Sequence, residues 1–370
     1  MIEKKHNKSL FSLSPKVNDQ NLILLVNRFQ IVNLVFFSTG HLNYFYMFFY
    51  IIIAWIISQI NIFIISNLIN SEKGKLGYTG LKKTLGVKMT RLIVILFTVH
   101  SILKIICLLI PTVTLLSIYI RYLGNRKTFL TLIFIIVYYL SSKGLAYVYK
   151  FVVLAFLMTF WISLIYIYLT VMSYESLNII YPLVRFELDD NIVELILLSL
   201  VLFSGPEYLL LIGPRLNKNV KILRALSIGN AITFIQVTIF FIGSVFFYSA
   251  GHMNIVNHIF MPMARYLQLP YIERIDIIIL PLLMLYYIYV ISLLVLYILK
   301  VIELKVKTVN KNHLLYLVIF LFIISIISLN KYGAKSHLEV YKDINYYLSI
   351  FSFCFIPLFF YITSKIKEGA

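Results

Sequence analysis

The sequence is poor in charged residues, and poorest in acidic ones. Charged side chains make up 13% of its 370 residues, with 33 Lys and Arg against 15 Asp and Glu. Soluble domains carry about 25% charged residues, and a chain this apolar could not cover a water-facing surface. No polar stretch reaches about 50 residues, the lower end of domain size. A soluble globule and a large soluble catalytic domain are therefore excluded.

Cysteine and the common catalytic motifs are scarce as well. The two cysteines, Cys107 and Cys354, both lie inside apolar runs and are expected to be small core residues. The sequence contains no glycine-rich phosphate loop, no H-E-x-x-H zinc motif and no nucleophile elbow. We therefore expect a protein that is not an enzyme and that uses neither a cofactor nor a metal.

The net charge of +18 has two interpretations. A basic patch can bind nucleic acid, but a basic excess in a multi-span protein usually marks cytoplasmic loops beside anionic lipid. Because 61% of the residues are hydrophobic, we expect membrane lipid as a partner and no nucleic acid.

Long apolar runs dominate the chain, whose mean hydropathy is +0.91. A helix needs about 20 residues to cross a bilayer, and apolar runs separated by charged turns predict an all-α integral membrane protein with about ten transmembrane helices. The expected spans cover about Leu22–Leu42, Tyr44–Ile69, Leu92–Ile120, Phe129–Ser141, Phe151–Val171, Ile192–Gly213, Ala225–Phe247, Ile277–Leu299, His313–Leu329 and Tyr346–Thr363.

The expected organisation is one transmembrane domain, residues 22–363, between an N-terminal tail at 1–21 and a C-terminal tail at 364–370. Of the 33 Lys and Arg residues, 22 fall in the tails and the loops on their side, nine fall on the other side, and Arg28 and Lys104 fall within spans. Because cytoplasmic loops collect Lys and Arg, both tails are predicted to be cytoplasmic.

Charged side chains inside spans are costly and mark functional candidates. The sharpest is Glu207, in the run Phe203-Ser204-Gly205-Pro206-Glu207 of the sixth span. Gly and Pro both weaken a helix, and a broken helix beside a carboxylate exposes backbone groups to a substrate or cation. The alternative is a proline kink in which Glu207 pairs with a nearby lysine.

A second interruption is predicted in the first span, at Ser38, Thr39 and Gly40. Gly40 permits local unwinding, although small polar residues also serve as helix-packing contacts. In a chain of two five-helix halves, spans one and six occupy corresponding places. Interruptions at corresponding places point to a binding site at the bilayer midplane.

Two further spans contribute candidates. His100 and Lys104 are four residues apart in the third span and share a face, and the alternative there is an interhelical hydrogen bond plus a distant ion pair. Tyr287, in a tyrosine run of the eighth span, is a candidate pocket residue, although interface belts are the commoner use of such tyrosines. Four amide side chains are expected to hold helices together, namely Gln59, Asn61, Asn230 and Gln236.

Four short motifs follow one another along the chain. They are Lys83-Thr84-Leu85-Gly86, Lys143-Gly144-Leu145, the run from Phe203 to Glu207, and Tyr271-Ile272-Glu273-Arg274-Ile275-Asp276. In this order and spacing they resemble motifs of the spore germination permeases, the B subunits of GerA-type nutrient germinant receptors. The resemblance covers about residues 80–300.

The resemblance implies a LeuT-like fold of the amino acid–polyamine–cation superfamily, with inverted five-helix repeats at about 22–171 and 192–363. It also implies a place in the inner membrane of spores, a small nutrient ligand, commonly an amino acid, and A and C subunits as partners. Ligand contacts in that family come from the unwound parts of spans one and six. On this sequence they correspond to Ser38, Thr39, Gly40, Phe203, Ser204, Gly205 and Glu207.

The leading hypothesis is therefore the transmembrane subunit of a spore nutrient germinant receptor. The alternative is a cation- or proton-coupled amino-acid transporter in which Glu207 is the protonatable group. A membrane enzyme such as a glycosyl-lipid transferase is disfavoured, because the largest outer loop, about 248–276, carries only four charges: Arg265, Glu273, Arg274 and Asp276.

Overall fold

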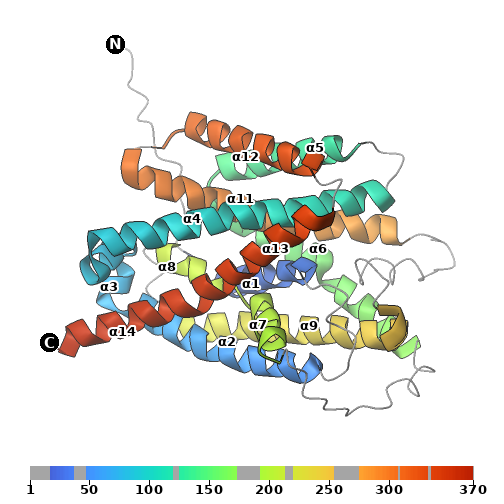
Figure 1. Ribbon diagram of the computed structural model, residues 1–370, viewed down its shortest axis with the longest axis horizontal. Coiled ribbons are helices and arrows are strands. Elements are labelled where there is room, and N and C mark those ends of the chain that lie inside the picture. The colour runs from blue at the N-terminus through green and yellow to red at the C-terminus, as the bar shows by residue number, and fades with distance from the viewer. Residues whose placement is uncertain are drawn as a thin grey trace.

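The computed structural model describes residues 17–36, 47–119, 125–172, 192–212, 220–253, 275–306, 309–331 and 335–369. These residues form helices, and no β-strand occurs among them. The long helices lie lengthwise along the molecule (Figure 1). They are α1 (Asp19–Ile31), η1 (Val32–Phe36), α2 (Met47–Asn70), α3 (Glu72–Lys75), α4 (Tyr78–Tyr119), α5 (Arg126–Ser142), α6 (Leu145–Met172), α7 (Ile192–Leu202), η5 (Pro206–Tyr208), α8 (Leu209–Ile212), α9 (Ile222–Met253), α11 (Asp276–Val306), α12 (Lys311–Lys331), α13 (Lys335–Ile350), η7 (Phe351–Phe355) and α14 (Ile356–Gly369).

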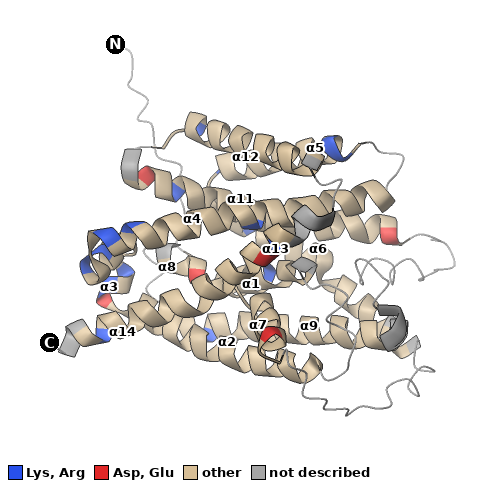
Figure 2. Cartoon of the chain, in the orientation of Figure 1, with Lys and Arg blue, Asp and Glu red and all other residues tan. Residues whose placement is uncertain are grey.

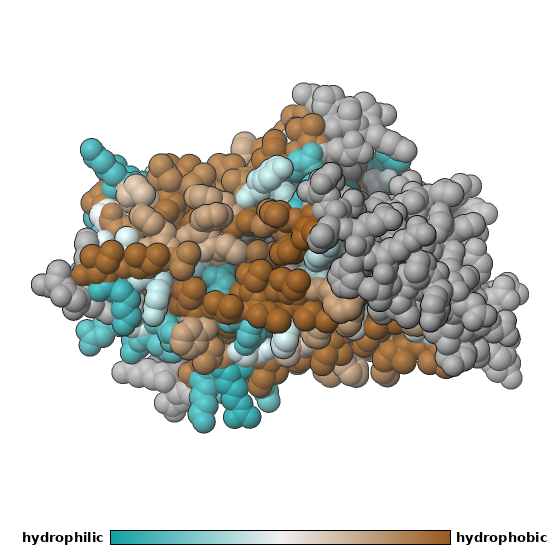
Figure 3. Space-filling view, turned by 60° about the horizontal axis from the view of Figure 1, so that its bottom comes forward, coloured by the Kyte–Doolittle hydropathy of each residue, from teal (hydrophilic) through white to brown (hydrophobic). Residues whose placement is uncertain are grey.

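Among the described residues, seven helical segments are long and apolar enough to cross a membrane. Large apolar side chains cover much of the described surface in one view, while hydrophilic ones gather toward one end and the lower edge (Figure 3). Leu157 on α6 is 67% exposed and Ile95 on α4 is 60% exposed, as expected for side chains that face lipid. The chain is a multi-pass membrane protein. The seven segments are Met47–Asn70, Tyr78–Tyr119, Leu145–Tyr168, Ile222–Phe247, Asp276–Leu304, Lys311–Asn330 and Val340–Ile366.

The other three expected spans correspond to shorter helices. α1 has 13 residues, α5 has 17 and α7 has 11. Two of them are shortened by a change of backbone conformation, because α1 passes into the tighter turn of η1 and α7 ends before Gly205. Length and composition therefore support seven candidate spans in the described part of the chain, and the count of ten stays a prediction.

Two spans begin earlier than predicted. α4 begins at Tyr78 instead of near Leu92, and its backbone bends at Gly86, whose φ is +82°. The final helix begins at Lys335 instead of near Tyr346 and passes through the π-helical turn η7. The lysines of residues 78–91 suggested a loop, but a helix that extends beyond the bilayer can carry charge on its outer turns.

α1 lies at the centre of the bundle (Figure 1) and packs most extensively against α9, with further contacts to α6 and α11. Gly229 of α9 permits the close approach of these two helices, since a Cβ atom there would lie 2.7 Å from the carbonyl oxygen of Ile23. Leu22, Leu25 and Phe29 of α1 are fully buried. The first helix is thus the core of the molecule, and it positions the site described below.

Charged side chains are distributed unevenly along the molecule. Lys and Arg residues of α3, of the start of α4 and of the end of α14 lie at one end of the bundle (Figure 2). The sequence assigned these segments to the same side of the membrane. Both cysteines lack a disulfide partner, with Cys107 buried and Cys354 half-buried, as expected for packing residues.

Candidate functional site

The sixth expected span is interrupted, as its sequence predicts. α7 ends at Leu202, the backbone leaves the helical conformation, and a short 3-10 turn, η5, begins at Pro206. Gly205 has φ +140°, a conformation that side chains with a Cβ atom rarely adopt. A Cβ atom at this position would also lie 2.7 Å from Cδ1 of Phe29. Glycine is therefore required here both by the backbone and by the packing of α1.

Two amide side chains satisfy the carbonyl groups that the break releases. Nδ2 of Asn33 donates to the carbonyl oxygens of Val201 and Ser204, both at 3.0 Å, and more weakly to that of Leu202 at 3.3 Å. Nε2 of Gln30 donates to the carbonyl oxygen of Phe203 at 2.8 Å. Buried carbonyl groups need such donors, so the interruption is a built feature of the fold.

The same face of α1 makes a ladder of hydrogen bonds with α9. Nδ2 of Asn27 donates to Oγ1 of Thr233 at 3.0 Å and to Oε1 of Gln236 at 2.9 Å. Nε2 of Gln30 donates to Oδ1 of Asn230 at 3.0 Å. Sequence reasoning missed Gln30 and Asn33 as partners of the break and Asn27 as a partner of α9. Their spacing of three residues places them on one helix face, which signals a polar contact but does not identify its partner.

Glu207 lies in the break and is completely buried. Its Oε2 atom accepts a hydrogen bond from the backbone N–H of Gly205 at 2.6 Å, and its Oε1 atom has no hydrogen-bond partner among the described residues. Lys104 on α4 is also fully buried, and its Nζ atom has no hydrogen-bond partner among the described residues. The two side chains attract each other electrostatically but form no direct hydrogen bond.

Aromatic rings pack around this pair of charges. The ring of Tyr208 lies 5.1 Å from that of Phe29, 5.7 Å from that of Phe97 and 5.2 Å from that of Tyr297, between ring centroids. Nζ of Lys104 lies 4.9 Å from the ring centroid of Phe29, a distance at which a cation interacts with the ring face. Apolar surroundings of this kind strengthen any charge interaction made with a ligand.

His100 connects the break to the last expected span. Its Nδ1 atom lies 3.1 Å from the hydroxyl of Tyr208 and 3.2 Å from that of Ser352, and its Nε2 atom lies 3.0 Å from that of Ser349. The interhelical hydrogen bond considered for His100 is therefore present. Both ring nitrogens of His100 are occupied by these hydroxyl groups. His100 therefore contributes to the site indirectly, through its contact with Tyr208.

Comparison with known proteins identifies the family. A family model described as spore germination protein matches residues 25–333. The chain belongs to the spore germination protein family. No curated protein matches the chain. The matched region contains the interrupted span, the second half of α1 and the ladder to α9, while α13, η7 and α14 lie beyond it.

Two glycine positions in this spore germination protein agree with the motifs that carried the resemblance. Gly86, which ends the first motif, is the bend of α4 with φ +82°. Gly144, with φ +86°, lies in the tight turn between α5 and α6. Both positions require a backbone conformation that glycine alone adopts without strain, which explains why glycine stands there.

The structure brings together five of the nine predicted site residues. Phe203, Ser204, Gly205 and Glu207 lie at the break, and His100 contacts it through Tyr208. The other four predicted residues are not seen at the break. Tyr287 lies beside Thr112 of α4, while Ser38, Thr39 and Gly40 lie outside the described residues.

The aromatic residue that α11 supplies to the break is Tyr297 instead of Tyr287. Tyr297 is ten residues further along the same helix, almost three turns away, and its hydroxyl group has no hydrogen-bond partner among the described residues. A tyrosine run signals an aromatic face, but it does not show at which depth that face meets the break.

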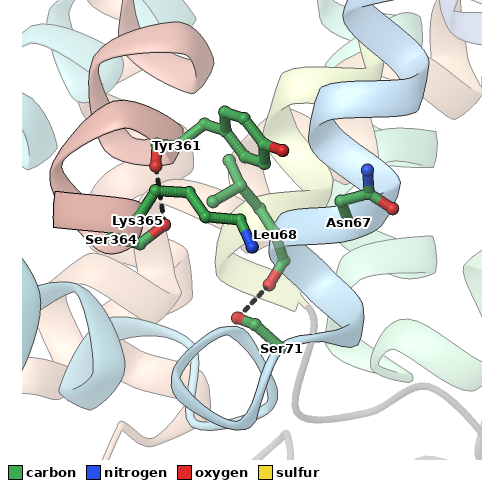
Figure 4. Close-up of a pocket in the computed structure, with 6 residues that line it drawn as sticks. All are labelled: Asn67, Leu68, Ser71, Tyr361, Ser364 and Lys365. Atoms are coloured by element: carbon green, nitrogen blue, oxygen red, sulfur yellow. Dashed lines mark hydrogen bonds between the residues drawn. The ribbon is translucent and has the colours of Figure 1, made fainter. Parts of the chain in front are cut away.

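A separate cavity of about 320 Å³ lies between the end of α2 and α14 (Figure 4). Asn67, Leu68 and Ser71 line one side of it, and Tyr361, Ser364 and Lys365 line the other. This cavity is at the basic end of the bundle, and its lining shares no residue with the break. No group of three His, Cys, Asp or Glu residues that could hold a metal occurs in the described ranges.

Proposed function

We propose that this member of the spore germination protein family is the transmembrane subunit of a nutrient germinant receptor. It binds a small nutrient, in our proposal an amino acid, at the interrupted sixth span. The observation that carries the proposal is the pair of buried and incompletely bonded charges at the break, Lys104 and Glu207. A buried charge without a full set of partners is costly, and such sites in membrane proteins usually serve a ligand.

The two charges suit a zwitterion. The ammonium group of Lys104 offers three donors to a carboxylate, and the free Oε1 atom of Glu207 offers an acceptor to an amino group. The aromatic side chains of Phe29, Phe97 and Tyr297 supply apolar contact for a side chain of the nutrient. In this arrangement the ligand completes the hydrogen bonds that the protein alone leaves unmade.

The proposed architecture has ten spans in two inverted five-helix repeats, as in LeuT-like proteins. The three short helices α1, α5 and α7 stand where the additional spans are expected. α7 with η5 forms one of the two proposed interrupted segments, and the other, at Ser38, Thr39 and Gly40, lies outside the described residues. The proposed location is the inner membrane of the spore, with both termini in the cytoplasm. The gathering of Lys and Arg at one end of the bundle supports this orientation.

Signalling requires that ligand binding shift the population of two conformations. The hydrogen bonds of His100 supply a physical connection, because they join the break through Tyr208 to Ser349 and Ser352 near the π-helical turn η7. In our proposal A and C subunits read out a movement of this last helix, and the subunit acts as a receptor without catalysing a reaction.

Germination of spores that carry Glu207→Gln or Gly205→Ala tests the proposal. Both variants should need at least tenfold more nutrient for a half-maximal germination rate, because the first removes the carboxylate and the second forces a Cβ atom against Phe29. Glu303→Gln is the matched control, since Glu303 pairs with Lys300 on α11, away from the break. Parental germination by both variants, at parental levels of the protein in the membrane, would contradict the proposal.

One observation favours a second function, coupled amino-acid transport. The free, buried Oε1 atom of Glu207 is a suitable place for a transported proton. Purified protein in liposomes distinguishes the two functions, because a transporter accumulates a labelled amino acid when a proton or cation gradient is applied and a receptor subunit does not.

A further inference from the structure

Arg28 is a further charged side chain buried in the bundle, and it takes no part in the contacts described above. It lies on α1 directly before Phe29 and is fully buried. The Cζ atom of its guanidinium lies 4.7 Å from the ring centroid of Phe156 on α6 and 4.2 Å from that of Tyr286 on α11. The guanidinium of Arg28 therefore lies between α6 and α11, on the side of α1 that contacts these two helices.

The rings leave the hydrogen-bonding capacity of Arg28 unused. Its Nε, Nη1 and Nη2 atoms have no hydrogen-bond partner among the described residues. The N–H bonds of a guanidinium point outward in its plane and require an oxygen or an anion as acceptor, so contact with a ring face does not satisfy them. Tyr286 lies close enough to stabilise the charge of Arg28, and the guanidinium stacks on the face of its ring.

The helices around Arg28 supply no carboxylate to this position. α6 contains neither Asp nor Glu. On α1, Asp19 lies nine positions before Arg28. On α11, Asp276 lies ten positions before Tyr286. At 1.5 Å per residue this is about 13 Å or more along the helix axis. Each of these carboxylates therefore lies several helical turns from the contact position on its own helix.

A second free donor interacts electrostatically with the guanidinium. The hydroxyl of Tyr289 is buried, interacts electrostatically with Arg28, and has no hydrogen-bond partner in the described part of the chain. Arg28 and Tyr289 thus combine a positive charge with several donors directed at no acceptor. Burial of a charge in this state is strongly destabilising unless something compensates for it.

We propose that Arg28 and Tyr289 form an internal site for one small monovalent anion, either a halide ion or the carboxylate group of a small organic acid. The charge balance supports one negative charge, because Arg28 and Lys104 are both positive and, among the described residues, Glu207 is the buried carboxylate that opposes them here. The site is separate from the nutrient site, which lies on the side of α1 that faces α4 and η5. It does not depend on the proposed function.

Thermal unfolding of the purified protein in detergent tests the site. The parent and Arg28→Met should exchange their order in unfolding temperature when a small anion is added. With the large buffer anion HEPES as the only anion, Arg28→Met should unfold at a higher temperature than the parent, because it removes an uncompensated buried charge. Chloride or acetate, added at constant ionic strength, should raise the unfolding temperature of the parent by several degrees in a saturable manner. Arg28→Met should not respond, so that the order of the two proteins reverses.

Arg91→Met is the matched control, since Arg91 is exposed on α4, and it should keep the parental anion response. Glu207→Gln should also keep it, which separates this site from the break. If Arg28→Met does not fold, Tyr289→Phe keeps the ring and should weaken the apparent anion affinity at least fivefold. Saturation by chloride alone assigns a halide, and saturation by acetate alone assigns a carboxylate. The inference is overturned if neither anion has a saturable effect on the parent, or if Arg28→Met or Tyr289→Phe responds as the parent does.

Discussion

At the scale of single residues, Asn33 occupies the most demanding position of the described site. One amide group serves the carbonyl oxygens of Val201, Leu202 and Ser204 in a place that water does not reach. A carbonyl group that loses its partner in such surroundings keeps the full cost of its removal from water. The stability of the break therefore depends on a residue more than 160 positions away in the sequence.

Asn33→Ala should lower the free energy of unfolding by about 2–3 kcal/mol, because it leaves buried carbonyl groups unpaired. Denaturant titration of the purified protein measures this change. Asn67→Ala is the matched control: Asn67 is half-buried and lines the cavity at the end of α2, so its loss should cost less than about 1 kcal/mol. Equal effects of the two substitutions would show that Asn33 does not support the break.

Several site residues could be predicted from the sequence because their chemistry is local. Gly205, Pro206 and Glu207 break a helix and bury a charge whatever lies around them. Gln30 and Asn33 could not be predicted as their partners, because an amide in an apolar helix has many candidate acceptors and only the fold selects one. Tyr297 was missed for a similar reason, since the depth at which α11 meets η5 is a tertiary property.

At the scale of elements, the close contact of α1 and α9 decides whether the site is assembled. The backbones approach at Gly229, and this approach brings Asn27 and Gln30 within hydrogen-bond distance of α9. Packing and interhelical hydrogen bonds drive helix association in a bilayer, where the hydrophobic effect between helices is absent. The ladder and the small residue are therefore parts of one contact.

Gly229→Ala should lower the unfolding temperature and should cost about 1–3 kcal/mol, the usual range for overpacking. The added Cβ atom would meet backbone and would push α9 away from the carbonyl oxygen of Ile23. Ile235→Ala tests the same helix at a position that is 56% exposed, where truncation should have little effect. An unchanged unfolding temperature for Gly229→Ala would mean that α1 and α9 can move apart at this position without loss of stability.

Element boundaries were predicted well where apolar runs end in charged turns, and poorly where a helix continues out of the bilayer. The predicted spans agree with helices α2, α6, α9, α11 and α12 to within several residues at most ends. α4 and α13 begin 14 and 11 residues before the predicted starts, Leu92 and Tyr346. Hydropathy reports the part of a helix that is in lipid, and it carries no signal for the part that is in water.

At the scale of the whole molecule, the uneven distribution of charge predicts how the protein lies in the membrane. The basic end contains α3, the start of α4 and the end of α14 (Figure 2), and positive charge is retained on the cytoplasmic side. Arg126, at the start of α5, belongs to the loops assigned to the opposite side.

Cysteine labelling in sealed membrane vesicles tests this orientation. In a background without Cys107 and Cys354, Lys82→Cys should react with an impermeant maleimide only in inside-out vesicles, and Arg126→Cys only in right-side-out vesicles. Both positions are exposed on their helices, so accessibility depends on the side of the membrane. Labelling of both positions from the same side would exclude the predicted topology.

The amides of Gln30 and Asn33 donate to main-chain oxygens of residues 201–204, and Asn33 donates in addition to the hydroxyl of Ser204. A contact made in this way is indifferent to which amino acids supply the carbonyl groups. These hydrogen bonds therefore set no requirement on the side chains at 201–203, which are constrained by their packing in the core instead. A new ligand preference can arise at this break through substitutions that leave its scaffold intact.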